Sequence, residues 1–251
     1  MNIERAHKIW TEIGESDPMW AVLTAEEKRG RKWKPEEFFA TGREEVSRAL
    51  CTIRDAGVTL KEGTALDFGC GMGRLSQALA EHFERVDGVD VSASMIRQAQ
   101  EFNKRPEKVE YHLNVKTDLS LFPKNRFDFI YSAIVLQHIP PQDQLLYIAE
   151  FMDLLKIGGV AYFQTIHSHG WRALFPSWFA EACWAIKYRG GEPHIPMYGV
   201  RPADVERVIR NGGGHLEKKM SGEMIDAYCS RFAADAFLVV KHHAKGGCCA
   251  H

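Results

Sequence analysis

From Thr64 onward, short apolar runs alternate with segments that carry apolar residues at helical spacing. The runs predict strands, and the segments between them predict helices. Repeated strand–helix units favour a parallel sheet with helices on both faces, a doubly wound, Rossmann-like α/β fold. The predicted strands are 64–68, 85–89, 109–113, 127–132 and 160–166, and the predicted helices are 74–83, 92–104 and 142–155.

The rest of the chain frames these units. Residues 1–57 are predicted to form an N-terminal helical cap, and 58–241 the main domain, which closes with a helix over 202–211 and strands over 215–220 and 232–241. An insertion rich in aromatic residues, 168–198, follows the fifth strand, and 242–251 is predicted to be a flexible tail. All six tryptophans lie in the cap or the insertion. We expect these two segments to meet above the sheet as one aromatic cap, with local packing of each as the alternative.

Composition excludes several classes of protein. The 251 residues carry 32 Lys and Arg against 33 Asp and Glu, so the chain lacks the strong positive field that attracts nucleic acid. The sequence has no run of 18 apolar residues, so no membrane span is predicted. The N-terminus lacks a secretory signal, so a cytoplasmic location is expected. The six cysteines, including Cys248 and Cys249 near His251, have no zinc spacing, and we expect no metal site.

The strongest motif joins the first strand to the first helix. Asp67 ends the strand, and Gly69, Gly71 and Gly73 follow it, a turn that lets the backbone approach a ligand. Arg74 stands where a dinucleotide fingerprint has its third glycine, which disfavours a nicotinamide enzyme. Asp90 ends the second strand, where a carboxylate can accept both hydroxyls of a ribose. The pattern therefore predicts a nucleoside site. The alternative is that Asp67 is only a polar residue at a strand end and Asp90 only a favourable charge at a helix N-terminus.

Five segments in succession, LDFGCGMGRLS, VDGVDVSASMI, TDLSLFPKNRFDFIYS, LQHI and LLKIGGV, resemble the ordered motifs of class I S-adenosylmethionine-dependent methyltransferases over residues 60–166. The resemblance implies seven strands, the last antiparallel, and S-adenosylmethionine as cofactor. It implies that Asp67 and the glycine turn hold the methionine end, and Asp90 the ribose. It places the adenine near Asp118 and Leu119, with Asn114 where many members carry an acid. The predicted cofactor site also includes Arg74, Val91, Met95 and Ala133.

Several of these residues have a plain alternative. Asn114 is also consistent with an ordinary loop residue, and Cys70 with a small filler between glycines. Arg74 either binds the cofactor carboxylate or only belongs to its helix, and Arg43 is a similar candidate. The basic run 28–34 either binds phosphate or forms a solvated face, since glutamates flank it.

Methyl transfer from a sulfonium is an in-line displacement, which needs an aligned nucleophile and exclusion of water. A base is needed where the acceptor holds a proton. His138 after the fourth strand and His167 at the end of the fifth are candidates, with packing roles as the alternative. Residues 132–135 lack the Asx-Pro-Pro-aromatic motif of enzymes that methylate amide or adenine nitrogens.

We therefore expect a small-molecule methyltransferase that acts on a small or medium organic acceptor. A lipid or prenylated acceptor also fits an apolar cap. The competing hypothesis is a catalytically silent subunit that binds S-adenosylmethionine in support of a partner.

Overall fold

The computed structural model describes residues 3–168, 197–222 and 232–242. Most of the predicted aromatic insertion (168–198) and of the predicted tail (242–251) lies outside these ranges. The prediction that the N-terminal cap meets the insertion therefore also lies outside the described residues.

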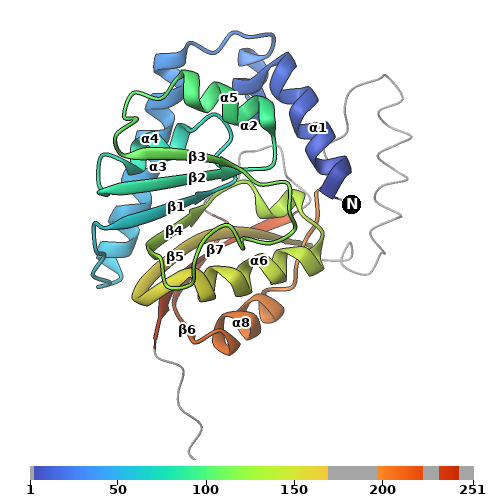
Figure 1. The fold of residues 1–251 in the computed structure, drawn as a ribbon. Helices are drawn as coiled ribbons and strands as arrows, with labels where there is room; N and C mark the ends of the chain where they lie inside the picture. Colours follow the sequence, from blue (N-terminus) through green and yellow to red (C-terminus); the bar gives the residue numbers. More distant parts are fainter. Residues whose placement is uncertain (1–2, 169–196, 223–231, 243–251) are drawn as a thin grey trace, which may run out of the picture.

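A seven-stranded sheet runs through the molecule in the order β3-β2-β1-β4-β5-β7-β6 (Figure 1). Neighbouring strands from β3 to β5 are parallel, whereas β7 is antiparallel to both β5 and β6. The predicted doubly wound sheet with an antiparallel last strand is confirmed. The strands are β1 (Thr64–Phe68), β2 (Arg85–Asp90), β3 (Val109–Leu113), β4 (Phe127–Ser132), β5 (Leu155–Ser168), β6 (Gly214–Ser221) and β7 (Phe232–Lys241).

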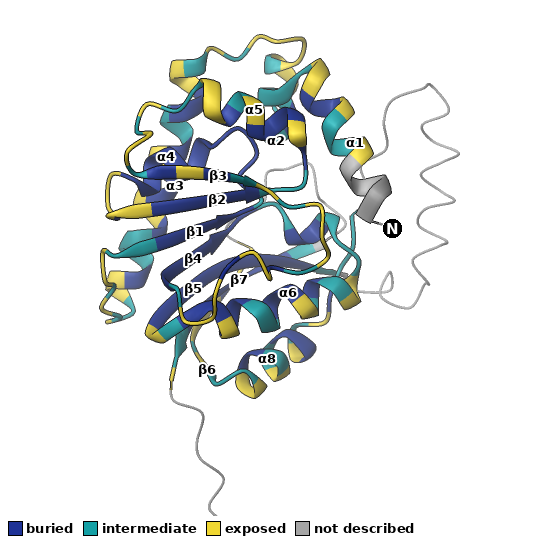
Figure 2. Ribbon diagram, viewed as in Figure 1, coloured by how far each residue is buried: buried dark blue, intermediate teal, exposed yellow. Residues whose placement is uncertain are grey.

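Helices cover both faces of the sheet and leave the strands buried between them (Figure 2). One face packs against α3 (Pro35–Asp55), α4 (Arg74–Leu79) and α5 (Ala93–Glu101). The other packs against α6 (Pro141–Leu154) and α8 (Pro202–Asn211). Alternate residues of β5 and β7 enter opposite cores, as a two-sided sheet requires; Tyr162 joins the first core and Phe163 the second.

A smaller core fastens the N-terminal helices α1 (Ile3–Ser16) and α2 (Pro18–Val22) to the sheet domain. Ile13 and Ala21 pack there with Phe38, Phe39 and Met95. Helix α3, which was predicted as part of the cap, also sends Val46, Ala49 and Ile53 into the main core of the sheet. It is therefore a layer of the sheet domain at one end and part of the N-terminal packing at the other.

The connection from α6 to β5 differs from the sequence prediction. The helix was expected to run to residue 155 and to end at the glycine pair 158–159. Instead α6 ends at Leu154 and β5 begins at the next residue. Gly158 has φ of 77°, and the register against β4 shifts between Phe127 and Phe129. Residues Gly158 and Gly159 therefore lie at an irregularity inside β5 and do not end the helix.

The helices within the described residues include none that combines the length and the apolar character needed to cross a membrane.

Candidate active site

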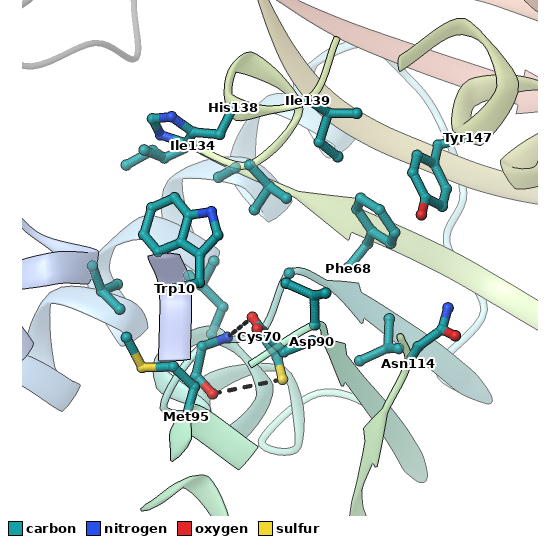
Figure 3. Close-up of a pocket in the computed structure, with 18 of the residues that line it drawn as sticks. Trp10, Phe68, Cys70, Asp90, Met95, Asn114, Ile134, His138, Ile139 and Tyr147 are labelled. Carbon is teal, nitrogen blue, oxygen red and sulfur yellow. Dashed lines mark hydrogen bonds between the residues drawn. The ribbon is translucent and has the colours of Figure 1, made fainter. Parts of the chain in front are cut away.

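A pocket opens at the carboxyl ends of β1, β2, β3 and β4, and helices α1, α2 and α6 contribute to its walls. Open α/β sheets bind ligands in this position. Figure 3 shows Trp10, Ile134 and His138 at one end of the pocket and Phe68, Asn114 and Tyr147 at the other. We call the first group the α1 end and the second the α6 end. Asp90 and Cys70 lie between the two groups (Figure 3).

The glycine turn after β1 is fixed by its own backbone. The N–H groups of Gly69 and Cys70 both donate to the carbonyl oxygen of Val89, at 2.8 and 3.0 Å. Gly69, Gly71 and Gly73 have φ values of 76°, 51° and 78°, a region that favours glycine. A Cβ atom on Gly69 would also collide with the Val135 side chain. The floor of the pocket at this turn is therefore formed by backbone atoms of glycines, which have no side chain to block a ligand.

Asp90 ties the turn to the start of helix α5. One carboxylate oxygen accepts from the N–H of Gly71 at 2.8 Å, and the other accepts from the N–H of Ser92 at 2.8 Å. Burial raises the pKa of Asp90, and these backbone hydrogen bonds oppose the shift. Ser92 caps α5 by accepting from the N–H of Met95. The carboxylate is thus oriented by backbone groups on both sides and still lines the pocket.

The opposite wall comes from β4 and the short turn η2 (Leu136–His138). His138 packs edge-to-face against Trp10, with ring centroids 5.1 Å apart. Ile134 has φ of 63°, an unusual backbone for a β-branched residue. Such strain persists only where the surrounding structure holds it, and it often marks functional sites. The α1 end therefore joins a titratable imidazole to an apolar surface.

Comparison with known proteins agrees with this geometry. A family model described as "Methyltransferase domain" matches residues 65–159, the part that carries the glycine turn, Asp90 and His138. The structure superposes on a magnesium protoporphyrin IX methyltransferase from Synechocystis PCC 6803 with bound SAH, at a TM-score of 0.62. That alignment covers 95% of this chain and 99% of the other, at 15% identity.

Residues 65–159 thus match a methyltransferase domain, and the fold is that of S-adenosylmethionine-dependent methyltransferases.

Curated relatives of this chain include the ubiquinone biosynthesis O-methyltransferase of Coxiella burnetii (strain RSA 331 / Henzerling II), 32% identical over 162 residues. The alignment covers 63% of this chain and 66% of the relative, just under two thirds of its length. The protein of the same name from Thiobacillus denitrificans (strain ATCC 25259 / T1) is 26% identical over 189 residues, which are 75% of this chain and 79% of the relative.

The pocket is lined by nine of the fourteen predicted site residues. Its lining includes Gly69, Gly71, Arg74, Asp90, Val91, Met95, Asn114, Ala133 and His138. Asp67, Gly73, Asp118, Leu119 and His167 lie outside that lining. The roles of all fourteen stay predictions.

Asp67 lies buried behind the turn. One carboxylate oxygen accepts from the Ser76 hydroxyl at 2.6 Å, while the other has no hydrogen-bond partner. Burial raises the pKa of Asp67 to about 7, against the opposing effect of that hydrogen bond. Gly73 caps α4 with a left-handed backbone, and a Cβ atom there would run into the Tyr111 hydroxyl. Both residues therefore shape the turn from beneath in this structure.

Arg74 lines the pocket but already has a partner. Its guanidinium donates to the Glu45 carboxylate at 2.7 Å, and the Tyr131 hydroxyl donates to the same carboxylate at 3.2 Å. Only the Arg74 Nε lacks a partner. Because Glu45 belongs to α3, the pair joins two helices on one face of the sheet. Arg43, the similar candidate, lies exposed on α3 outside this pocket.

The loop after β3 divides the predicted adenine residues. The Asn114 amide donates to the carbonyl oxygen of Asp118 at 2.7 Å, which folds the loop back on itself. Asn114 and Thr117 then face the pocket, while Leu119 enters the core with an exposed fraction of 2%. A hydrogen bond from the Ser120 side chain lowers the pKa of Asp118. The loop is in the predicted place, and Asn114 reaches the pocket as predicted, whereas Thr117 does so in place of Asp118 and Leu119.

His167 lies outside the pocket lining. Its Nδ1 is 3.4 Å from a carboxylate oxygen of Asp235, whose other oxygen accepts from the Ser221 hydroxyl at 2.7 Å. Tyr198 donates its backbone N–H to the carbonyl oxygen of Gln137, so that segment adjoins the His138 turn.

Sequence reasoning missed the residues that approach the pocket from distant segments. Trp10, Val22, Ile134 and Tyr147 are examples, and none lies in a motif. The aromatic content of residues 1–57 was the only signal for Trp10, and it pointed to a cap rather than to one residue.

One group of possible metal ligands occurs within the described ranges, Asp87, Glu110 and His112, on the outer strands β2 and β3. Asp87 already accepts two hydrogen bonds from Arg126, at 3.0 and 2.7 Å, and pairs with His112 at 2.8 Å. The cluster therefore has a structural explanation, as a charged link between strands.

Proposed function

We propose that this methyltransferase transfers the methyl group of S-adenosylmethionine to a hydroxyl oxygen of a small or medium organic acceptor. The observation that carries the proposal is one pocket that joins a glycine turn and a buried carboxylate to an imidazole on an apolar wall. The names of the curated relatives, which are O-methyltransferases, support oxygen as the acceptor atom. A cytoplasmic location and the absence of nucleic-acid partners stay predictions.

The donor set fits the cofactor. Asp90, between the two ends of the pocket, is placed for ribose hydroxyls, because a buried carboxylate can accept both. The α6 end, where the Phe68 and Tyr147 rings pack 4.8 Å apart near Asn114, suits a flat base. The turn at Gly69 and Gly71 then faces the methionine portion. This order would leave the α1 end for the acceptor.

When bound, S-adenosylmethionine supplies a methyl group activated by positive sulfur. The chain's own task is to align the acceptor and keep water out, and alignment alone can supply roughly 7–11 kcal/mol of such a barrier. Trp10, Ile134 and Ile139 form the apolar wall that excludes water. His138 is the group in the wall that can take the hydroxyl proton at an imidazole nitrogen as oxygen attacks.

The test is transfer of label from S-adenosylmethionine labelled on its methyl group. Purified protein is incubated with panels of hydroxylated, amino and thiol compounds of similar size and with a metabolite extract. We expect labelled ether products with release of S-adenosylhomocysteine, and none with the matched methyl ethers. Binding of S-adenosylhomocysteine without transfer to any compound would favour the silent subunit instead. Labelled amines or thioethers would overturn the choice of oxygen.

A further inference from the structure

The carboxyl end of helix α1 is anchored by residues from two other segments. A helix leaves its last carbonyl groups without intrahelical partners. Here the carbonyl of Gly14 accepts from the Gln98 side chain at 2.7 Å. The carbonyls of Glu15 and Ser16 accept from the Arg31 guanidinium at 3.0 and 2.8 Å. Side chains distant in sequence therefore satisfy three carbonyls at this helix end.

Arg31 is itself held in an unusual conformation. Its φ is 59°, a left-handed backbone that costs free energy for a residue with a side chain. The Asp17 carboxylate holds the bend by accepting the N–H groups of Gly30 and Arg31 at 2.8 and 2.9 Å. The basic run 28–34 thus places one arginine at the end of α1, the end where cations are favoured.

Helix α5 holds the same stretch of α1 from the side. The hydroxyl groups of Ser92 and Ser94 donate to the carbonyls of Trp10 and Thr11 at 3.2 and 2.9 Å. Gly14 permits the approach, since a Cβ atom there would lie 2.5 Å from the Ser94 hydroxyl oxygen. The backbone of α1 therefore lies directly against side chains at the start of α5, and no residue larger than glycine fits at position 14 without a shift.

These contacts have a consequence for the pocket. Trp10, one turn before the anchor, lines the pocket and touches His138 across it. Ser92, which contacts α1 through its hydroxyl, donates its N–H to Asp90. The position of α1 is therefore tied to the carboxylate proposed for the ribose and to the wall proposed for the acceptor.

We propose that Gln98 and Arg31 are positioning residues for methyl transfer, acting through α1. They dock the helix so that Trp10 closes the pocket, and a bound nucleoside and the docked helix stabilise each other. The reciprocity follows from linkage, because Ser92 hydrogen-bonds both Asp90 and α1, so a ligand held by Asp90 binds the docked state more tightly. This inference rests on the proposed cofactor site. It adds that residues outside the pocket set its affinity.

The test compares Gln98→Ala with Gln100→Ala. Both replace glutamine by alanine on α5, but Gln100 is exposed and its side chain makes none of the hydrogen bonds to α1. Binding of S-adenosylhomocysteine is measured by calorimetry, and amide exchange of residues 3–16 is followed with and without it. In wild type and Gln100→Ala we expect the ligand to slow exchange in α1. In Gln98→Ala we expect faster exchange and a Kd raised on the order of fivefold, the size of one lost hydrogen bond.

Gly14→Ala is the second variant. Alanine favours a helix over glycine, so it strengthens α1 itself while its Cβ atom disturbs the contact with Ser94. We expect the same weaker binding as in Gln98→Ala, with the melting temperature of the ligand-free domain unchanged in both. A merely structural role would lower that temperature and leave ligand-dependent protection intact.

The outcomes separate the two proposals. If wild type does not bind S-adenosylhomocysteine, the cofactor site is wrong and the positioning role falls with it. Suppose instead that wild type binds but Gln98→Ala binds equally well, or that amide exchange in α1 is the same with and without the ligand. Only the positioning role is then overturned.

Discussion

The floor of the pocket and its α1 end are built in different ways. The middle and floor, Gly69 to Gly71 with Asp90, come from two adjacent strands and are fixed by backbone hydrogen bonds to Val89 and Ser92. The α1 end is assembled from Trp10, Ile134 and His138, which belong to segments far apart in the chain. One part is local and rigid, whereas the other depends on how α1 docks.

This difference separates binding of the nucleoside from choice of the acceptor. A substitution in the α1 end that leaves helix α1 docked also leaves the hydrogen bonds of the glycine turn in place, so acceptor preference can change while cofactor binding persists. A substitution in the turn disturbs backbone groups that no other residue can replace. Substitutions at each part of the pocket therefore test the separation.

The largest effect is expected at the α1 end, from His138→Gln. Loss of a general base typically lowers the rate by about 10²–10⁴-fold. We expect kcat to fall in that range while the Kd of S-adenosylhomocysteine stays within about twofold, because Asp90 and the turn are untouched. Steady-state kinetics and calorimetry measure the two quantities. His82→Gln, at an exposed histidine, is the control. An unchanged kcat would show that the acceptor sheds its proton without His138.

The next effect concerns stability at the floor, through Asp67. The folded pKa of Asp67 is raised to about 7 from 3.8, so the folded carboxyl keeps its proton while the unfolded one ionises. Stability from this group is therefore lost as pH rises between these two values and is level above them. At about 1.4 kcal/mol per unit, the free energy of unfolding should fall by about 4 kcal/mol over this window.

Asp67→Asn removes that ionisation. Urea unfolding near pH 5 and near pH 8 should show a smaller loss of stability in the variant than in wild type. Since the histidines titrate in both proteins, the difference between the two slopes is the quantity to compare. Equal slopes would mean that Asp67 is already ionised in the folded protein.

The sequence predicted the local part of the molecule well and the assembled part poorly. The alternation of strands and helices and the turn at Gly69 follow from patterns contained in short segments, and the family resemblance supplied the antiparallel last strand. Trp10 and Tyr147 reach the pocket only because α1 and α6 pack where they do. That placement depends on side chains such as Gln98, for which no motif exists.

Side-chain direction limited the prediction even within motifs. Asp118 and Leu119 follow the third strand as expected, but Asn114 folds the loop so that Thr117 faces the pocket. Leu119 instead joins the core, where its burial is favourable. Position along the chain therefore located the loop, and only packing decided which residues it presents.

Substitution of Asp90 is expected to weaken cofactor binding, by a smaller factor than the loss of kcat in His138→Gln. Asp90→Ala removes the carboxylate proposed for the ribose, so the Kd of S-adenosylhomocysteine should rise more than about tenfold. The same change removes the acceptor for two backbone N–H groups, and Asp90→Asn, which keeps the side-chain shape, separates the two causes. Asp153→Ala, at an exposed acid, is the control. An unaltered Kd in Asp90→Ala would place the ribose elsewhere.

The smallest effect is expected from Tyr147→Phe at the α6 end, which shares the assembled character of the α1 end. The Tyr147 hydroxyl donates to the carbonyl of Lys116 at 3.3 Å, and its ring packs on Phe68. Removing the hydroxyl loses one long hydrogen bond to a partly exposed loop, so the Kd of S-adenosylhomocysteine should change less than about threefold. Tyr147→Ala also removes the ring and should weaken binding further. A large effect of Tyr147→Phe would show that the loop after β3, rather than the Tyr147 ring, forms the adenine site. The nucleoside half of the pocket would then also depend on packing between distant segments.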